Sequence, residues 1–127
     1  MKALCFFEHG DLDVLQYADV PDPEPGPGEV LVRVRACTLN HLDIWVREGW
    51  PGLKLELPHW TGADVAGEVA GLGEGVTGWE VGQRVVVDPG LTTRQDEYTR
   101  RGEDSVSPGH VILGEHVRGG QAEYLAI

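Results

Sequence analysis

The sequence predicts a mainly β fold, in which short strands are joined by tight turns and a few short helices. Short runs of apolar residues alternate with polar ones, most clearly from Val30 to Cys37. The 18 glycines and 8 prolines are spread between these runs and not gathered in one tract, which indicates many turns and argues against disorder. With 127 residues, 41% of them hydrophobic, the chain is long enough for one domain with its own core.

The N-terminal part predicts a hairpin followed by an extended connector. Lys2 to Phe7 and Val14 to Val20 are typical of strands, and His9-Gly10-Asp11 between them is a turn signal. Every second residue from Pro21 to Pro27 is proline, a spacing that forbids helix and favours a rigid, extended loop. A proline-rich ligand for a partner is the alternative.

The run from Val30 to Cys37 carries the strongest strand signal. Strict alternation predicts two faces, with Val30, Val32, Val34 and Ala36 on one and Leu31, Arg33, Arg35 and Cys37 on the other. We expect the two arginines to be solvated, and an anion site is the alternative. After this strand Asn40 can cap a helix of one or two turns that ends at Gly49.

Further strands are predicted from Val65 to Leu72, Arg84 to Val87, His110 to Leu113 and Gln121 to Ile127. The glycines from Gly71 onwards come close to a dinucleotide-binding fingerprint, but they do not keep its spacing and no helical pattern follows them. Turns between strands explain them better.

Charge and cysteine content exclude several classes of function. The net charge of −11 disfavours binding to nucleic acid or to an anionic membrane surface. No apolar run approaches the roughly 20 residues of a membrane span, and the run from Met1 to Phe7 is too short for the apolar region of a signal peptide. We therefore expect a cytoplasmic protein. Cys5 and Cys37 lie within strand patterns and are expected to be buried free thiols.

Four motifs in order carry a resemblance to a known family. They are PDPEPGPGEV, VLVRVRACTLNHLDIWVREG, LPHWTGADVAGEVAGLGEGVTGWEVGQRVVV and ILGEHVRGGQAEYLAI. The chain resembles, over nearly its whole length, the N-terminal GroES-like catalytic domain of the medium-chain dehydrogenase/reductase superfamily. That superfamily includes zinc-type alcohol dehydrogenases and quinone oxidoreductases.

The resemblance implies a partly open β-barrel with short helices over residues 1–127. It also implies a Rossmann domain that binds NADP or NAD, which these residues do not supply, so we expect the chain to be part of a longer enzyme and inactive alone. The sequence does not decide whether the protein forms a homo-oligomer.

The resemblance also shows which residues of this sequence stand at the zinc-ligand positions of zinc-type members. Matched residue by residue, the family's catalytic Cys and His positions fall on Asn40 and Ala63, and Cys37 lies three residues too early. No metal ligands are therefore predicted, because tetrahedral zinc needs three protein donors. A site improvised from His41 and Asp64 is the alternative.

The polar stretch at about 88–109 resembles the lobe that holds a structural zinc in zinc-type members. The four cysteine positions of that lobe carry Thr93, Asp96, Thr99 and Ser107. Because these side chains do not replace thiolates, we expect a degenerate, metal-free and rather mobile lobe. An ordinary polar loop is the alternative.

Asn40, Asp43, Arg47 and Gly49 match the NxxDxxxRxG segment of the zinc-independent branch, the quinone oxidoreductases and enone reductases. The resemblance therefore implies a small carbonyl compound as substrate. Asn40 and Asp43 are the candidate catalytic residues, and His41 and Trp45 the candidate neighbours of substrate or cofactor. Helix capping by Asn40 and a first-turn role for Asp43 remain alternatives. Trp45 departs from the branch, which often has Tyr there.

Two further functions stay open. One is a zinc-type alcohol dehydrogenase domain with shifted ligands. The other is a stand-alone GroES-like binding module without catalysis.

Overall fold

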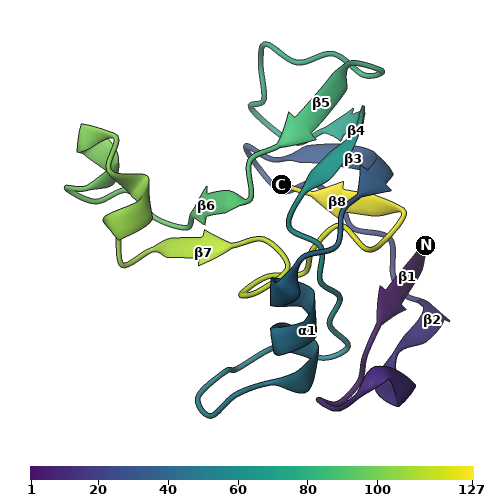
Figure 1. The fold of residues 1–127 in the computed structure, drawn as a ribbon. Coiled ribbons are helices and arrows are strands. Elements are labelled where there is room, and N and C mark those ends of the chain that lie inside the picture. The colour runs from purple at the N-terminus through teal and green to yellow at the C-terminus, as the bar shows by residue number, and fades with distance from the viewer.

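The computed structural model describes residues 1–127, and an antiparallel sheet of four strands lies at its centre (Figure 1). The sheet order is β5 (Arg84–Val87), β4 (Val65–Leu72), β3 (Val30–Cys37) and β8 (Tyr124–Ala126). The first three strands have the bounds that the alternation predicted, whereas β8 is shorter than expected. The mainly β fold is thereby confirmed.

A bulge in β3 changes the faces that simple alternation predicted. Val34 pairs with Gly67 and Ala36 with Ala66, so the register shifts at Arg35. An extra residue of this kind breaks the period of two. Cys37 consequently packs, like Val34, against the buried cluster of Val65, Leu113 and Leu125, while Ala36 is exposed. The prediction that Ala36 shares the face of Val34 was wrong for this reason.

The N-terminal hairpin is confirmed, with shorter strands than expected. β1 (Lys2–Cys5) pairs antiparallel with β2 (Gln16–Asp19), and a short 3-10 helix, η1 (Leu12–Val14), precedes β2. Ala3 and Cys5 of this hairpin form a second buried cluster with Val20 and Trp60. Both cysteines are free thiols.

Helix α1 (His41–Glu48) follows β3 and ends at Gly49, as predicted. Gly49 has φ +77°, a conformation that glycine adopts without strain. Arg47, only 5% exposed, donates to the carbonyl of Gly10, and the backbone N–H of Gly10 donates to the carbonyl of Arg47. These bonds hold the helix against the turn of the N-terminal hairpin.

Residues 88–109 form most of a lobe that projects away from the central sheet (Figure 1). Two strands connect it to the barrel, β6 (Gly90–Thr92) and β7 (His110–Ile112), and they pair antiparallel. Two 3-10 helices, η2 (Thr99–Arg101) and η3 (Asp104–Val106), lie at its far end. The sequence pattern missed β6, because its three residues are too few to show alternation.

Four glycines let two loops cross in direct backbone contact. Gly119, Gly120 and Gln121 donate N–H bonds to the carbonyls of the segment from Trp60 to Gly62, at 2.8 to 3.0 Å. A Cβ atom on Gly119 would lie 2.5 Å from two carbonyl oxygens of that segment, and one on Gly114 would lie 2.7 Å from the nitrogen of Gly62. We call Gly62, Gly114, Gly119 and Gly120 the glycine crossing. No helix in the structure is long and apolar enough to span a membrane.

Candidate functional site

The candidate site lies where the end of β3 meets the start of β4. Cys37 pairs with Val65, and beyond this pair the N–H of Thr38 donates to the carbonyl of Asp64 at 3.1 Å. The chain then turns into α1 through Asn40. The register of two adjacent strands therefore places Asn40 beside Asp64, although 24 positions separate them in the sequence.

Asp64 holds the side chain of Asn40. The amide nitrogen of Asn40 donates to Asp64 Oδ2 at 2.9 Å, and the hydroxyl of Thr38 donates to the same oxygen at 2.9 Å. The side chains of all three residues are exposed at the surface. The bonds from Asn40 and Thr38 hold the pKa of Asp64 below its usual value, so Asp64 is an anion at neutral pH.

Asp43 holds the backbone of the same residue. Its Oδ2 accepts the N–H of Asn40 at 2.6 Å, which caps the first turn of α1, and its Oδ1 accepts the N–H of Gly62 at 3.0 Å. One carboxylate thus joins the helix to the glycine crossing. Asn40 is fixed at two points, its backbone by Asp43 and its amide by Asp64, and this limits the directions in which the amide can point.

A cavity of about 450 Å³ opens beside this cluster. Its polar lining includes Asn40, His41 and Asp43, and half of its lining residues are apolar, namely Leu4, Phe6, Leu12, Leu15, Leu39 and Ile44. A few convergent polar groups on an apolar wall are typical of small-molecule sites. A larger groove of about 900 Å³ lies elsewhere and contains none of the predicted site residues, so we assign the site to the smaller cavity.

Trp45 does not line this cavity. Its ring lies 6.1 Å from that of His41, and its side chain is 58% exposed on the outer side of α1. The structure therefore brings Asn40, His41 and Asp43 together and leaves Trp45 next to them, on the outer side of the same helix.

The side chains at this site do not fit a catalytic zinc. At the two positions that the resemblance assigns to ligands, Asn40 offers a neutral amide and Ala63 a buried methyl group. Burial, with the nearby Asp43 and Asp64 carboxylates, raises the pKa of the Cys37 thiol to about 11, so it is not a thiolate at neutral pH. No three His, Cys, Asp or Glu side chains are grouped to hold a metal ion.

Comparison with known proteins agrees with this fold. Residues 26–127 match the alcohol dehydrogenase GroES-like domain. This chain belongs to that domain family. It is 33% identical, over its whole length, to an NAD-dependent alcohol dehydrogenase of Sulfolobus acidocaldarius, and 36% identical over 84% of its length to the quinone oxidoreductase of Sus scrofa. The chain spans 38% and 32% of the lengths of these relatives.

A crystal structure of an NAD-dependent alcohol dehydrogenase superposes on this GroES-like domain with a TM-score of 0.95 at 48% identity, covering the whole chain and 37% of that protein. The GroES-like barrel predicted from the four motifs is confirmed. The relatives include both alcohol dehydrogenases and quinone oxidoreductases, so the family alone does not choose between the two chemistries.

The sequence alone indicates a mainly structural role for Asp64, because a carboxylate next to a glycine bend often accepts backbone N–H groups, and it does not single out Thr38. Both residues contact the amide of Asn40 in this GroES-like domain, Thr38 through a long bond of 3.5 Å. The signal that could have found them is the pairing of the two long strands, since each residue lies immediately outside the predicted end of its strand.

Proposed function

We propose that this chain is the substrate-binding domain of an NAD(P)H-dependent oxidoreductase that reduces quinones, enones or related carbonyl compounds without a catalytic metal. The observation that carries the proposal is the position of Asn40. Asn40 lines a largely apolar cavity and its amide is held by an ionised carboxylate, while the two positions that the resemblance assigns to zinc ligands carry a neutral amide and a methyl group.

Asn40 supplies a donor of the kind that this reaction needs. Hydride delivered by a nicotinamide to the β-carbon of an enone moves negative charge to a remote oxygen. An amide nitrogen carries two N–H groups. The amide of Asn40 donates to Asp64 at 2.9 Å and makes only a long contact of 3.5 Å with the Thr38 hydroxyl, and we propose that its second N–H donates to the substrate oxygen. One well-placed donor of this kind contributes about 3 kcal/mol to stabilising a developing oxyanion.

Asp43 and Asp64 act on the position of this donor. The bonds from Asn40 to Asp43 and Asp64 restrict the rotamers of the Asn40 side chain before substrate binds. Less conformational entropy is then lost in the transition state, which is a form of preorganisation. His41 lines the same cavity and is placed to contact substrate or cofactor. For Trp45, which is exposed beside His41 on α1, we propose a contact with the cofactor or with the domain that carries it.

The proposal requires a separate nucleotide-binding domain. Within these 127 residues no helix begins between β4 and β5, where the glycine-rich stretch lies, so no helix N-terminus is available there for a pyrophosphate. The relatives are about three times as long as this chain, which leaves room in them for such a domain.

Alcohol oxidation is the second candidate. It is favoured by the 48% identity to an NAD-dependent alcohol dehydrogenase, which is higher than the 36% identity to a quinone oxidoreductase. A simple alcohol gains more from a Lewis acid than a conjugated carbonyl does, because its charge develops on the oxygen next to the reacting carbon. The residues at Asn40 and Ala63 are therefore the argument against it.

Two measurements test the proposal. The reading frame beyond Ile127 should encode a strand-GxGxxG-helix unit within the next tens of residues. The purified product of the whole frame should reduce an enone or a quinone with NADH or NADPH and should contain no stoichiometric zinc by elemental analysis. One zinc per chain together with ethanol oxidation would establish alcohol oxidation, the second candidate. A reading frame without a nucleotide-binding unit would contradict both candidates and favour a binding module without catalysis.

A further inference from the structure

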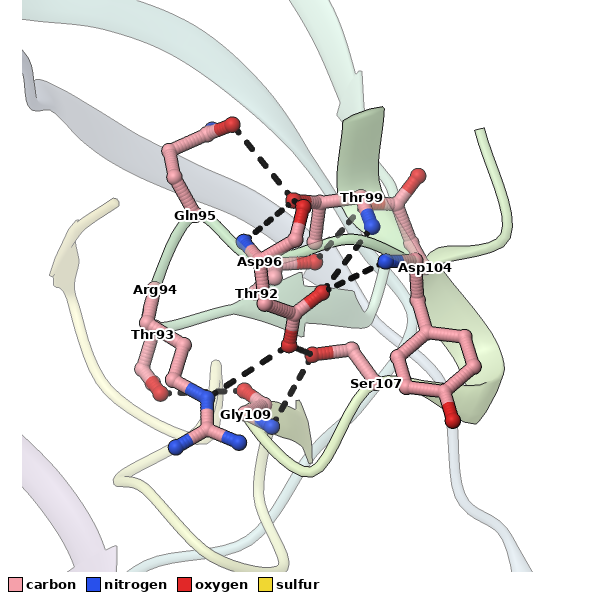
Figure 2. Close-up of polar contacts among 10 residues, drawn as sticks. Thr92, Thr93, Arg94, Gln95, Asp96, Thr99, Asp104, Ser107 and Gly109 are labelled. Carbon is pink, nitrogen blue, oxygen red and sulfur yellow. Dashed lines mark hydrogen bonds and ion pairs between the residues drawn. The ribbon is translucent and has the colours of Figure 1, made fainter. Parts of the chain in front are cut away.

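The projecting lobe is organised around the carboxylate of Asp96. Its Oδ1 accepts the backbone N–H groups of Tyr98 at 2.9 Å and Thr99 at 3.1 Å, and its Oδ2 accepts the hydroxyl of Ser107 at 2.6 Å. Arg94 Nε lies 3.5 Å from Oδ2. The Asp96 side chain is only 18% exposed, so both of its oxygens are enclosed by donors (Figure 2).

Ser107 and Thr93 extend these contacts to the base of the lobe. The hydroxyl of Ser107, a residue only 6% exposed, accepts the N–H of Gly109 at 3.0 Å. Thr93 donates to the carbonyl of Gly109 through its hydroxyl at 3.0 Å and through its N–H at 2.9 Å. A continuous path of hydrogen bonds thus runs from Thr93 and Gly109 at the base of the lobe, through Ser107, to Asp96 and Thr99, as Figure 2 shows.

The far end of the lobe closes on the same residue. The N–H of Asp96 donates to the hydroxyl of Thr99 at 2.9 Å, and that hydroxyl donates to the carbonyl of Asp96 at 3.1 Å. These bonds form the turn that leads into η2. Asp96 therefore contacts the chain before it, after it and eleven residues further on.

These side chains do not fit a structural zinc. Thr93, Asp96, Thr99 and Ser107 are the positions where the resemblance to zinc-type members implies cysteines. They offer three neutral hydroxyls and one carboxylate, whereas structural zinc sites use thiolates and imidazoles. Both oxygens of the carboxylate already accept hydrogen bonds, so a metal would have to displace bonds that hold the turn.

We propose that Asp96 is the centre of a metal-free clasp that takes the place of a metal in holding the lobe together. The clasp consists of Thr93, Asp96, Thr99, Ser107 and Gly109. A carboxylate that accepts three donors forms charge-assisted hydrogen bonds, which are stronger than neutral ones. Because the clasp is built from a carboxylate, hydroxyls and backbone groups and contains no thiolate, we expect that neither chelators nor oxidation of thiols opens the lobe. This proposal does not depend on which reaction the protein catalyses.

The test compares variants of the chain by hydrogen exchange and trypsin digestion. Asp96→Ala removes the centre of the clasp, and Ser107→Ala removes one hydroxyl without changing any charge. Glu97→Ala is the matched control, because Glu97 is the adjacent residue, is 61% exposed and has one ion pair, with Arg101 at 3.5 Å. Arg94, Arg100 and Arg101 provide trypsin sites within the lobe.

Exchange in residues 93–109 should rise by about ten-fold or more in Asp96→Ala and by a smaller factor in Ser107→Ala, with cleavage faster at the lobe arginines. Exchange in the central sheet and in Glu97→Ala should stay at the wild-type level, with or without a chelator. Equal exchange in Asp96→Ala and Glu97→Ala would overturn the proposal, as would a wild-type lobe that a chelator opens. If Asp96→Ala does not fold, an unchanged lobe in Ser107→Ala overturns it.

Discussion

The amide of Asn40 donates to Asp64 at 2.9 Å, and the backbone N–H of Asn40 donates to Asp43 at 2.6 Å. One residue at the start of α1 is thus held by carboxylates from two different segments. Its amide is directed by tertiary structure as well as by its place at the helix end. This arrangement favours a role in binding over a role limited to capping, and the first prediction separates the two.

Replacing Asn40 by Ala in the complete enzyme that we propose should lower turnover by about 10- to 1,000-fold, because it removes a donor from the place where charge develops. Enone reduction and the melting temperature should be measured on the same sample. A pure capping role predicts instead a loss of about 1 kcal/mol in stability with turnover per folded molecule unchanged.

Thr38→Val is the matched control for that experiment. It removes the other side-chain donor to Asp64 and the long 3.5 Å contact between the Asn40 amide and the Thr38 hydroxyl, while the amide keeps its 2.9 Å bond to Asp64. Its turnover should stay within a few-fold of wild type. A loss as large as that of Asn40→Ala would assign the effect to the carboxylate and not to the amide.

Asp43→Ala should lower the free energy of unfolding by about 2 kcal/mol or more, because it leaves the N–H groups of Asn40 and Gly62 without their acceptor. Urea denaturation of the chain measures this. Glu8→Ala is the control, since Glu8 is an exposed carboxylate of the N-terminal turn. Equal unfolding midpoints for the two variants would show that the bonds of Asp43 contribute nothing to stability.

His59 gives the protein a pH dependence. Burial lowers the pKa of His59 below its usual 6.5, and its neutral ring donates to the carbonyl of Gly114 at 3.2 Å. The folded state therefore binds a proton less readily than the unfolded state. The stability contributed by neutral His59 is fully present above pH 6.5 and is lost as the pH falls below that value, towards the folded pKa.

His59→Gln isolates this effect, because glutamine keeps an N–H donor but does not titrate. Between about pH 7.5 and about pH 5.5 the wild-type chain should lose more stability than the variant, as measured by urea denaturation at each pH. Parallel loss in both proteins would assign the pH dependence to other groups.

Two glycines of positive φ should respond differently to alanine. At Gly62 (φ +104°) a Cβ atom would lie 2.5 Å from Cys37 Sγ and 2.9 Å from the nitrogen of Gln121. At Gly75 (φ +78°) a Cβ atom would meet nothing within 4 Å. Gly62→Ala should therefore lower the free energy of unfolding by about 3 kcal/mol or more, and Gly75→Ala by about 1 kcal/mol. Similar losses would mean that the crowding at Gly62 relaxes without cost.

The chain alone should bind NADH and NADPH more weakly than about 1 mM by calorimetry. The glycine-rich stretch after β4 forms turns, and the N–H of Gly73 is already used in a bond to the carbonyl of Glu29 at 2.8 Å. Micromolar binding would show that this stretch, or another part of the barrel, forms a phosphate site.

The long strands could be predicted from the sequence because alternation over eight residues leaves few other structures. The start of α1 at Asn40 and its end at Gly49 could also be predicted, because both have local causes. The first depends on a capping residue and the second on a backbone conformation that suits glycine. The bulge at Arg35 could not be predicted, since it depends on which residues of β4 lie opposite. The bond between Asn40 and Asp64 depends on the same pairing, and for that reason the sequence alone does not reveal it.

The clasp shows a different limit of sequence reasoning. The spacing from Thr93 to Ser107 indicated that the lobe keeps the intervals of a metal site. Because the side chains at these positions do not replace thiolates, the sequence predicts a metal-free and rather mobile lobe. Whether polar side chains satisfy one another or only water depends on their geometry, and here Asp96 lies within 3.1 Å of donors from three residues.

The glycine crossing limits which substitutions this protein can accept. Side chains elsewhere in the barrel can exchange volume with their neighbours, but Gly114 and Gly119 face backbone atoms, which have no smaller alternative, and Gly62 faces the Cys37 sulfur and the backbone nitrogen of Gln121. A saturation library of the chain should therefore contain a patch of intolerant positions around residues 62, 114, 119 and 120, which Gly62 joins to the carboxylate of Asp43. The same library should tolerate changes better at exposed residues of the cavity wall such as Leu39 and Ile44, which are 81% and 44% exposed.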